Sequence, residues 1–213
     1  MSAFPHQFIA IEGNIGAGKT TLCQMLSADY GCRLILEQFS DNPFLPFFYE
    51  NPERHAFSVE LFFMTERHKQ LQEELQQTNL FDGTIIADYF FLKTLLFAKN
   101  NLSDEEYRLF QRLFHILNAQ FPRPDLLVYL HRPVNYLQEN IRKRARSFET
   151  EISAAYLQQI QQAYLDFFRS DLVQPTLIIQ MKGHDFIETP GFYAKIVDLL
   201  KKDYPAGVTY VEV

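Results

Sequence analysis

Short apolar runs alternate along the chain with longer segments in which apolar residues recur every three or four positions. The runs predict five buried strands, over residues 6–12, 33–37, 84–88, 125–131 and 176–180. The longer segments predict helices over residues 19–28, 52–77, 103–120, 133–146, 152–170 and 190–202. Strands that alternate with helices form parallel sheets, because right-handed crossovers return the chain to the same edge. We therefore predict an α/β fold with a five-stranded parallel sheet flanked by helices on both faces.

Composition indicates one domain that spans residues 1–213. Hydrophobic residues make up 47% of the 213 positions, which is enough for one substantial core. The 26 acidic and 20 basic side chains leave a net charge of -6, which argues against a general nucleic-acid binder. The sequence has no signal-peptide start and no long apolar run, and its two cysteines are too few for a disulfide framework. We therefore expect a cytoplasmic protein with no membrane or nucleic-acid partner.

A phosphate-binding loop joins the first predicted strand to the first predicted helix. Residues 13–20, GNIGAGKT, match the pattern GxxxxGK[ST] in the strand–turn–helix setting that it requires, which makes a merely structural glycine turn a poor alternative. Glycines let successive backbone N–H groups point toward one phosphate, and the helix adds the positive end of its dipole. Lys19 is expected to reach the β- and γ-phosphates of ATP, and Thr20 to help coordinate Mg²⁺. The expected ATP-binding residues here are Gly13, Asn14, Ile15, Gly16, Ala17, Gly18, Lys19, Thr20 and the adjoining Thr21.

Polar residues at the ends of the predicted strands should gather beside this loop. Glu37 and Asp88 each end a strand, and the carboxyl ends of parallel strands meet at one edge of a sheet, where ligands bind. There, the Glu37 carboxylate would lie near the γ-phosphate and could accept a proton from an attacking hydroxyl. A solvated strand end is the alternative interpretation of Glu37.

A cluster of arginines, Arg142, Arg144 and Arg146, predicts a lid over about residues 142–150. Three arginines at two-residue spacing cannot share one helical face, so they do not form a single row of surface ion pairs. Their planar guanidinium groups suit a flexible segment that closes over transferring phosphate, with Arg146 at the reacting group. The alternative is a basic helix end that the helix dipole favours.

A phosphate loop predicts a nucleotide and leaves the reaction open. The Asn-Lys-x-Asp motif of switch GTPases is absent, and the chain is short for a translocating ATPase. Several motifs together resemble the deoxyribonucleoside kinase family over nearly the whole chain. They are the loop in the form EGNIGAGKT, Glu37, Tyr49 followed eleven positions later by Glu60, Asp88, and the arginines with Glu149.

The resemblance implies a role for each of these residues. Glu37 falls at the general base, and Tyr49 and Glu149 at the residues that hold the sugar 3′-hydroxyl. Glu60 falls at the residue that reads the base, and Asp88 at the acidic position of an Asp/Glu-Arg-Ser signature. Phe97 is expected either to stack on the base or to pack in the core, and Arg142 and Arg144 are expected to face the phosphates. Thr20 and Asp88 are expected to hold Mg²⁺ directly or through water. The resemblance also implies that the chain forms a homodimer.

Two departures from the family pattern bear on specificity. Tyr89 replaces the arginine that supports the general base, and Glu60 replaces a glutamine. A carboxylate accepts hydrogen bonds without donating any, so it disfavours thymine and pairs best with guanine N1–H and N2–H₂. The Asp88-Tyr89 form looks more like bacterial deoxyadenosine kinases, however. We therefore expect phosphorylation of a deoxyribonucleoside 5′-hydroxyl with deoxyadenosine favoured, and deoxyguanosine or a broader set as the alternative.

Two further alternatives stay open. A nucleoside monophosphate kinase of the thymidylate kinase type shares the loop, sheet and lid, but needs more cationic residues to hold its acceptor phosphate. Between residues 44 and 60 the chain offers only Arg54 and His55 for this purpose. A non-catalytic ATP-sensing module needs only the loop, and it would leave Glu37 and the arginines without a task.

Overall fold

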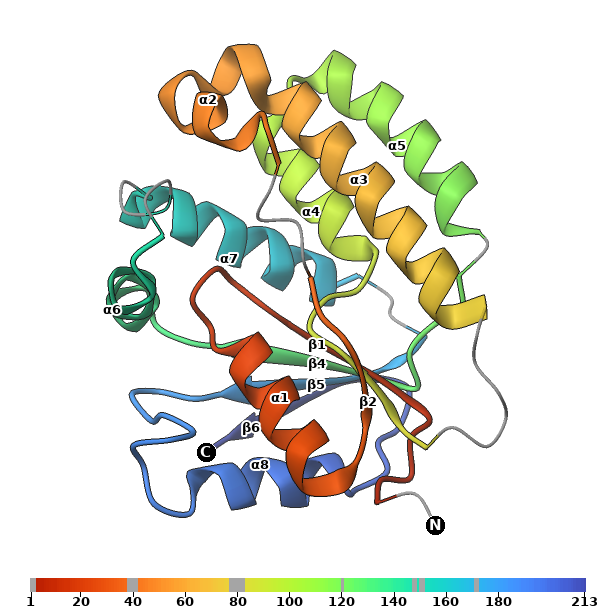
Figure 1. The fold of residues 1–213 in the computed structure, drawn as a ribbon, viewed down its shortest axis with the longest axis vertical. Coiled ribbons are helices and arrows are strands. Elements are labelled where there is room, and N and C mark those ends of the chain that lie inside the picture. Colours follow the sequence, from red (N-terminus) through yellow and green to blue (C-terminus); the bar gives the residue numbers. More distant parts are fainter. Residues whose placement is uncertain are drawn as a thin grey trace.

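The computed structural model describes residues 3–37, 42–76, 83–119, 121–146, 149, 152–170 and 173–213. Its centre is a sheet of six parallel strands in the order β2-β3-β1-β4-β5-β6 (Figure 1). The strands are β1 (Phe8–Gly13), β2 (Arg33–Ile35), β3 (Ile85–Ala87), β4 (Leu126–His131), β5 (Pro175–Gln180) and β6 (Gly207–Glu212). The predicted α/β fold and the five predicted strands are confirmed.

The sheet has one strand more than predicted, because the sequence did not predict β6. This strand pairs in register with β5, from Pro175 opposite Gly207 to Gln180 opposite Glu212. It lies at the edge of the sheet, where its side chains are half-buried or exposed. An edge strand needs no continuous apolar run, so the signal that identified the central strands is absent.

Eight helices connect the strands within the described residues. They are α1 (Lys19–Tyr30), α2 (Leu45–Glu50), α3 (Pro52–Gln76), α4 (Leu92–Asn101), α5 (Asp104–Asn118), α6 (Val134–Arg144), α7 (Ala154–Phe168) and α8 (Phe192–Leu200). The sequence did not predict α2 or α4. The first is a six-residue helix, too short to show a period, and α4 buries polar Lys93 and Thr94 with its apolar residues, which hides an amphipathic pattern. No helix in the described ranges is long and apolar enough to cross a membrane.

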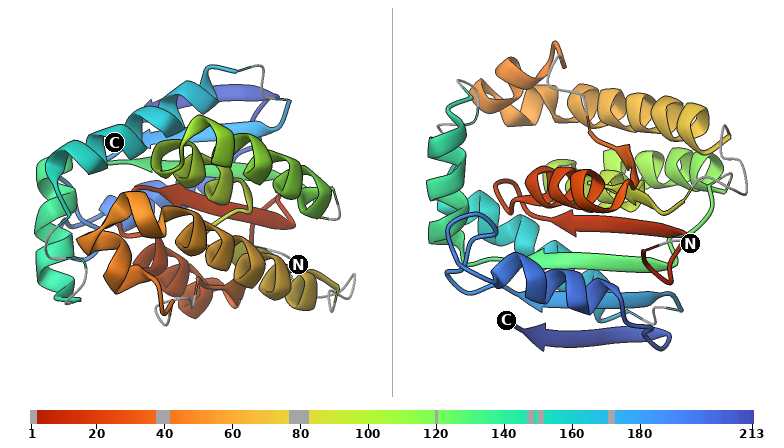
Figure 2. Two further views of the ribbon diagram at one scale, coloured as in Figure 1. Left: turned by 90° about the horizontal axis from the view of Figure 1, so that it is seen from above. Right: turned by 60° about the horizontal axis from the view of Figure 1, so that its bottom comes forward.

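Helices cover both faces of the sheet, as predicted. On one face α1 and α8 pack on Ile9, Val128 and Ile179. On the other face α3, α4, α5 and α7 pack on Ala10 and Tyr129, the strand neighbours that point the opposite way. Figure 1 shows α3, α4 and α5 above the sheet and α8 below it, and Figure 2 shows the same layers from two other directions.

The strand order places the ligand site. β1 lies between β3 and β4, so the chain leaves β1 toward one side of the sheet and later returns to the other side. Such a switch point opens a crevice at the carboxyl ends of the strands. Because β2 and β3 end at Ile35 and Ala87, Glu37 and Asp88 lie just beyond them, at this crevice.

Candidate active site

The phosphate-binding loop fills the turn between β1 and α1, as the sequence predicts. Gly16 and Gly18 have positive φ angles of 79° and 92°, a conformation that side chains with a Cβ rarely adopt. A Cβ at Gly16 would lie 2.6 Å from the carbonyl oxygen of Leu137, and one at Gly18 would lie 2.9 Å from the ring of Phe186. Both glycines are therefore required by backbone conformation and by space.

The side chain of Asn14 braces the loop. Its amide donates to the carbonyl oxygen of Leu157 on α7 at 2.7 Å, and its own oxygen accepts from the backbone N–H of Ile15 at 2.8 Å. Asn140 on α6 donates to the carbonyl oxygen of Gly16 at 2.8 Å. Hydrogen bonds with α6 and α7 thus hold the loop in this conformation.

Lys19 begins α1, and its side chain contacts the backbone of the loop. Its Nζ donates to the carbonyl oxygens of Gly13 and Asn14, each at 2.9 Å. Burial and the nearby charge of Lys93 lower the pKa of Lys19 to about 8, against the opposing effect of acidic neighbours that include Glu37. A bound phosphate would stabilise the charged form of this lysine, since it would replace the missing solvation.

Thr20 and Asp88 form the part of the site that suits a metal ion. The Thr20 hydroxyl donates to Asp88 Oδ2 at 2.5 Å, and Asp88 Oδ1 accepts from the backbone N–H of Glu37 at 2.7 Å. A hydroxyl and a carboxylate in contact fit Mg²⁺, which takes few protein ligands and keeps water or phosphate oxygens for the rest. Within the described part of the chain, no group of three or more His, Cys, Asp or Glu side chains could hold a metal alone.

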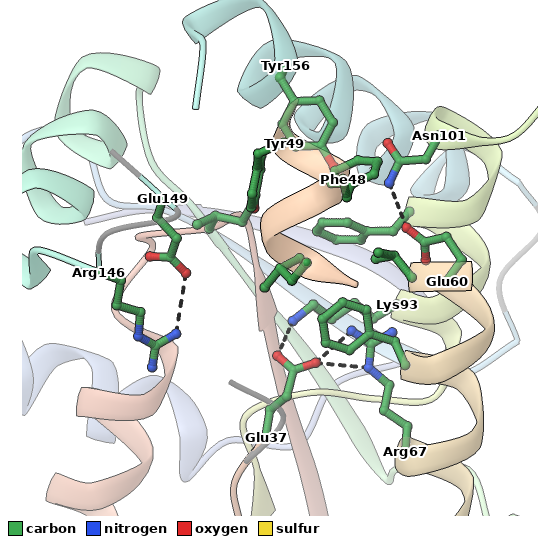
Figure 3. Close-up of a pocket in the computed structure, with 15 residues that line it drawn as sticks. Glu37, Phe48, Tyr49, Glu60, Arg67, Lys93, Asn101, Arg146, Glu149 and Tyr156 are labelled. Carbon is green, nitrogen blue, oxygen red and sulfur yellow. Dashed lines mark hydrogen bonds and ion pairs between the residues drawn. The ribbon is translucent and has the colours of Figure 1, made fainter. Parts of the chain in front are cut away.

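The Glu37 carboxylate is held between two cations. Lys93 Nζ lies 2.5 Å from its Oε2, and Arg67 donates to its Oε1 through Nη2 at 2.6 Å and Nε at 2.9 Å (Figure 3). Although burial raises the pKa of Glu37, the charges and hydrogen bonds of Lys93 and Arg67 outweigh it and set the pKa well below the usual range. The carboxyl group is therefore ionised, and its side chain remains 21% exposed.

Sequence reasoning missed both cations. Tyr89, which replaces the family arginine, is fully buried and donates its hydroxyl to Gln70 Oε1 at 2.7 Å. The positive charge comes instead from Lys93, four residues further along, and from Arg67 on α3. The spacing held one usable signal, because Arg67 follows Glu60 by two helical turns and so projects from the same side of α3.

Seven of the residues predicted to bind substrate or ATP line one pocket. They are Glu37, Tyr49, Glu60, Phe97, Arg146, Glu149 and, from the phosphate loop, Ile15. The other lining residues are Leu45, Phe48, Val59, Phe63, Arg67, Lys93, Asn101 and Tyr156. Asp88 is not among the residues that line this pocket, and its carboxylate accepts from the backbone N–H of Glu37. Its predicted role in holding the substrate stays a prediction.

Glu60 is the buried polar group of the pocket, 2% exposed. Its Oε1 accepts from Asn101 Nδ2 at 2.6 Å, whereas its Oε2 has no hydrogen-bond partner within the described residues (Figure 3). Burial raises the pKa of Glu60 to about 7, although the hydrogen bond from Asn101 and the charges of Arg67 and Lys93 act in the opposite direction. Phe97 lines the same pocket, and Lys93 Nζ lies over its ring, 5.6 Å from the ring centre.

The predicted lid begins at the end of α6. Arg142 and Arg144 lie in the last turn of this helix, and Arg146 follows after Ala145, whose φ of 52° ends the helix. Arg144 forms an ion pair with Glu149, and Arg146 Nη1 lies 3.3 Å from Glu149 Oε1. Residues 147, 148 and 150, also part of the predicted lid, lie outside the described residues.

Comparisons with known proteins show which family this chain resembles. The family model described as deoxynucleoside kinase matches residues 9–203. A deoxyguanosine kinase from Bacillus subtilis (strain 168) is 39% identical over 199 residues, which cover 92% of this chain and 96% of that protein. A deoxyadenosine kinase from Dictyostelium discoideum is 30% identical over 198 residues, which cover 92% and 78%. The structure of deoxyadenosine kinase from M. mycoides with bound dATP has a similar fold, with a TM-score of 0.77 over 92% of this chain and all of that chain, at 24% identity.

Proposed function

This chain belongs to the deoxynucleoside kinase family, and on that premise we propose that it transfers the γ-phosphate of ATP to the 5′-hydroxyl of a purine deoxyribonucleoside. The family makes it an ATP-dependent transferase. The observation that carries the proposal is the position of Glu37. The backbone N–H of Glu37 donates a hydrogen bond to Asp88, which also accepts one from Thr20 of the phosphate loop. The carboxylate of Glu37 lines the adjoining pocket.

Glu37 orients the hydroxyl in this mechanism. Held by Lys93 and Arg67, it is ionised but weakly basic, because its pKa lies far below neutrality. Phosphoryl transfer proceeds through a loose transition state in which the nucleophile has formed little bond, so alignment matters more than early proton removal. Glu37 accepts the hydrogen bond of the 5′-hydroxyl, points the oxygen at phosphorus and takes the proton as the new bond forms.

The phosphates are held from two sides. On one side, Lys19 and the backbone N–H groups of the loop before α1 bind them. On the other side, the arginines at the end of α6 approach them, namely Arg142, Arg144 and Arg146. When Arg144 and Arg146 turn toward phosphate, their ion pairs with Glu149 change, which leaves that carboxylate for the sugar 3′-hydroxyl beside Tyr49. Mg²⁺, held by Thr20 and Asp88 directly or through water, would offset the negative charge of the phosphates.

A neutral acceptor fits the pocket better than a monophosphate. Each cation that lines it within the described residues is already paired with a carboxylate: Arg67 and Lys93 with Glu37, and Arg146 with Glu149. Arg54, which the sequence offered for an acceptor phosphate, is exposed and does not line the pocket. A nucleoside monophosphate would thus find no unpaired positive charge there.

Between the purines, we place deoxyguanosine ahead of deoxyadenosine. When ionised, the Glu60 carboxylate has an unpaired acceptor, Oε2, that matches the N1–H and N2–H₂ donors of guanine. The 39% identical relative is a deoxyguanosine kinase, which points the same way. Deoxyadenosine, favoured from the sequence and named in the 30% identical relative, stays a prediction.

The remaining proposals concern the whole chain. We propose one catalytic domain over residues 1–213, a homodimer as the working form, and the cytoplasm as its location.

An ADP-release assay tests the proposed reaction. The protein receives MgATP and, separately, each of the four deoxyribonucleosides and their 5′-monophosphates. ADP release with a purine deoxyribonucleoside supports the proposal. Release with monophosphates alone would identify a nucleoside monophosphate kinase, and no release with any acceptor would indicate a non-catalytic ATP-binding module.

A further inference from the structure

One carboxylate oxygen of Glu60 is buried without a hydrogen-bond partner in the described part of the chain. A buried carboxylate oxygen normally accepts a hydrogen bond, because an unpaired buried charge is costly. Asn101 satisfies Oε1, whereas Oε2 is buried and has no hydrogen-bond partner within the described residues, in a side chain that lines the pocket. The ligand, or a proton on the carboxyl group itself, must therefore complete this side chain.

The charges around Glu60 do not fix its protonation state. Arg67 on the same helix and Lys93 on α4 are the nearby cations, and both are engaged by Glu37. The other groups that face it are the polar side chains Asn101 on α4, Tyr49 on α2 and Tyr156 on α7, and the carboxylate of Glu37. Glu60 thus combines full burial with cations that are already paired, and its pKa of about 7 agrees with this arrangement.

The two protonation states of a carboxyl group offer different patterns to a purine. An ionised carboxylate only accepts, so it pairs with guanine N1–H and N2–H₂ but faces the lone pair of adenine N1 unfavourably. A protonated carboxyl group both donates and accepts, so it pairs with adenine through N1 and N6–H₂. It also pairs with guanine through O6 and N1–H. Guanine therefore fits both states, whereas adenine requires the proton.

We propose that Glu60 is a proton-dependent selector between purines, which admits deoxyadenosine when protonated and rejects it when ionised, while deoxyguanosine is accepted in both states. This inference rests on the proposed function and adds to it the condition under which each purine is used. The structure assigns the selecting atom to Oε2, since Asn101 occupies the other oxygen.

A competition assay tests the proposal. Wild-type protein receives MgATP with equal concentrations of deoxyadenosine and deoxyguanosine, and the two monophosphate products are separated and counted between about pH 5.5 and about pH 8.5. Protonation of Lys19, Glu37 or ATP affects both reactions in the same tube, so it cancels from the product ratio, and neither base titrates within this range. We expect the ratio of dAMP to dGMP to fall about tenfold or more as pH rises.

Two variants make the test specific. Glu60→Gln keeps the shape and the bond with Asn101 but places a permanent donor at the vacant position, so its product ratio should be independent of pH and stay near the acid value of the wild type. Glu73→Gln removes one negative charge from the exposed side of the same helix and should keep the wild-type pH dependence.

Two outcomes overturn the selector role. One is a wild-type product ratio that stays constant with pH, and the other is a Glu60→Gln variant that keeps the wild-type pH dependence. If neither purine is phosphorylated at any pH, the proposed function itself fails, which is a different result from a constant ratio of two measurable products.

Discussion

Lys93 and Arg67 supply the positive charge beside Glu37 that Tyr89 cannot provide. Together they make three contacts of 2.5 to 2.9 Å with its carboxylate. Two cations on one carboxylate fix its orientation as well as its charge, and orientation is what phosphoryl transfer requires of this group.

Replacing Lys93 by methionine should move the acid limit of activity toward neutral pH. Glu37 would keep burial, which raises its pKa, and would lose the first of the two charges that lower it. We expect the acid limb of kcat/KM to shift upward by about one pH unit or more, and kcat at about pH 7.5 to fall roughly tenfold. Lys93→Arg retains the positive charge, so the acid limb of its kcat/KM profile should lie at the wild-type pH. An unchanged pH profile in Lys93→Met would remove Lys93 from this role.

Glu60 should also make the stability of the folded protein depend on pH. Because its pKa is raised from 4.5 to about 7 in the folded protein, the folded state holds a proton that the unfolded state has released, and stability is lost as pH rises between these values. Glutamine at position 60 does not titrate. The free energy of unfolding of Glu60→Gln should therefore gain roughly 2 to 3 kcal/mol on the wild type between about pH 5 and about pH 8.

Urea denaturation at both pH values measures this difference. If the difference in free energy of unfolding between Glu60→Gln and the wild type is the same at both pH values, Glu60 keeps an ordinary pKa in the folded protein. The raised pKa would then be wrong.

At the scale of elements, predictability followed burial. The central strands are buried on both faces and read as continuous apolar runs, so β1 and β4 were predicted within about two residues of their bounds. β6 has only half-buried and exposed positions, because it lies at the edge of the sheet, and the sequence did not predict it. The sequence did not predict α4 for the opposite reason, because this helix is buried on several sides. The positions of Lys93 and Asn101, which lie on α4, were therefore not predicted either.

The cap of α5 provides a test that is separate from the active site. Ser103 accepts from the backbone N–H of Glu106, and Glu106 reaches back to the N–H of Ser103, which completes the predicted capping box. Ser103→Ala should cost about 1 kcal/mol of stability, since one helix N–H loses its partner. Chemical denaturation measures the loss, and kcat should stay at the wild-type value. A loss of kcat without a loss of stability would connect α5 to catalysis.

At the scale of the whole molecule, the site follows from the topology. Parallel strands end at one edge, so the loop after β1, Glu37 after β2 and Asp88 after β3 were predicted to converge, and they do. The groups that could not be foreseen come from helices over the sheet. Arg67 reaches Glu37 from α3, and Asn101 reaches Glu60 from α4, because of how the helices pack on one another. Periodicity predicts a helix but does not predict which helix it will contact.

The turnover of a Glu37→Gln variant tests the central claim most directly. Glutamine keeps the size of the side chain but cannot take the proton of the 5′-hydroxyl and no longer attracts Lys93 and Arg67. With saturating MgATP and deoxyguanosine, we expect kcat to fall on the order of 100-fold or more, while the thermal midpoint shows that the variant is folded. A folded Glu37→Gln variant with near-wild-type kcat would contradict the account.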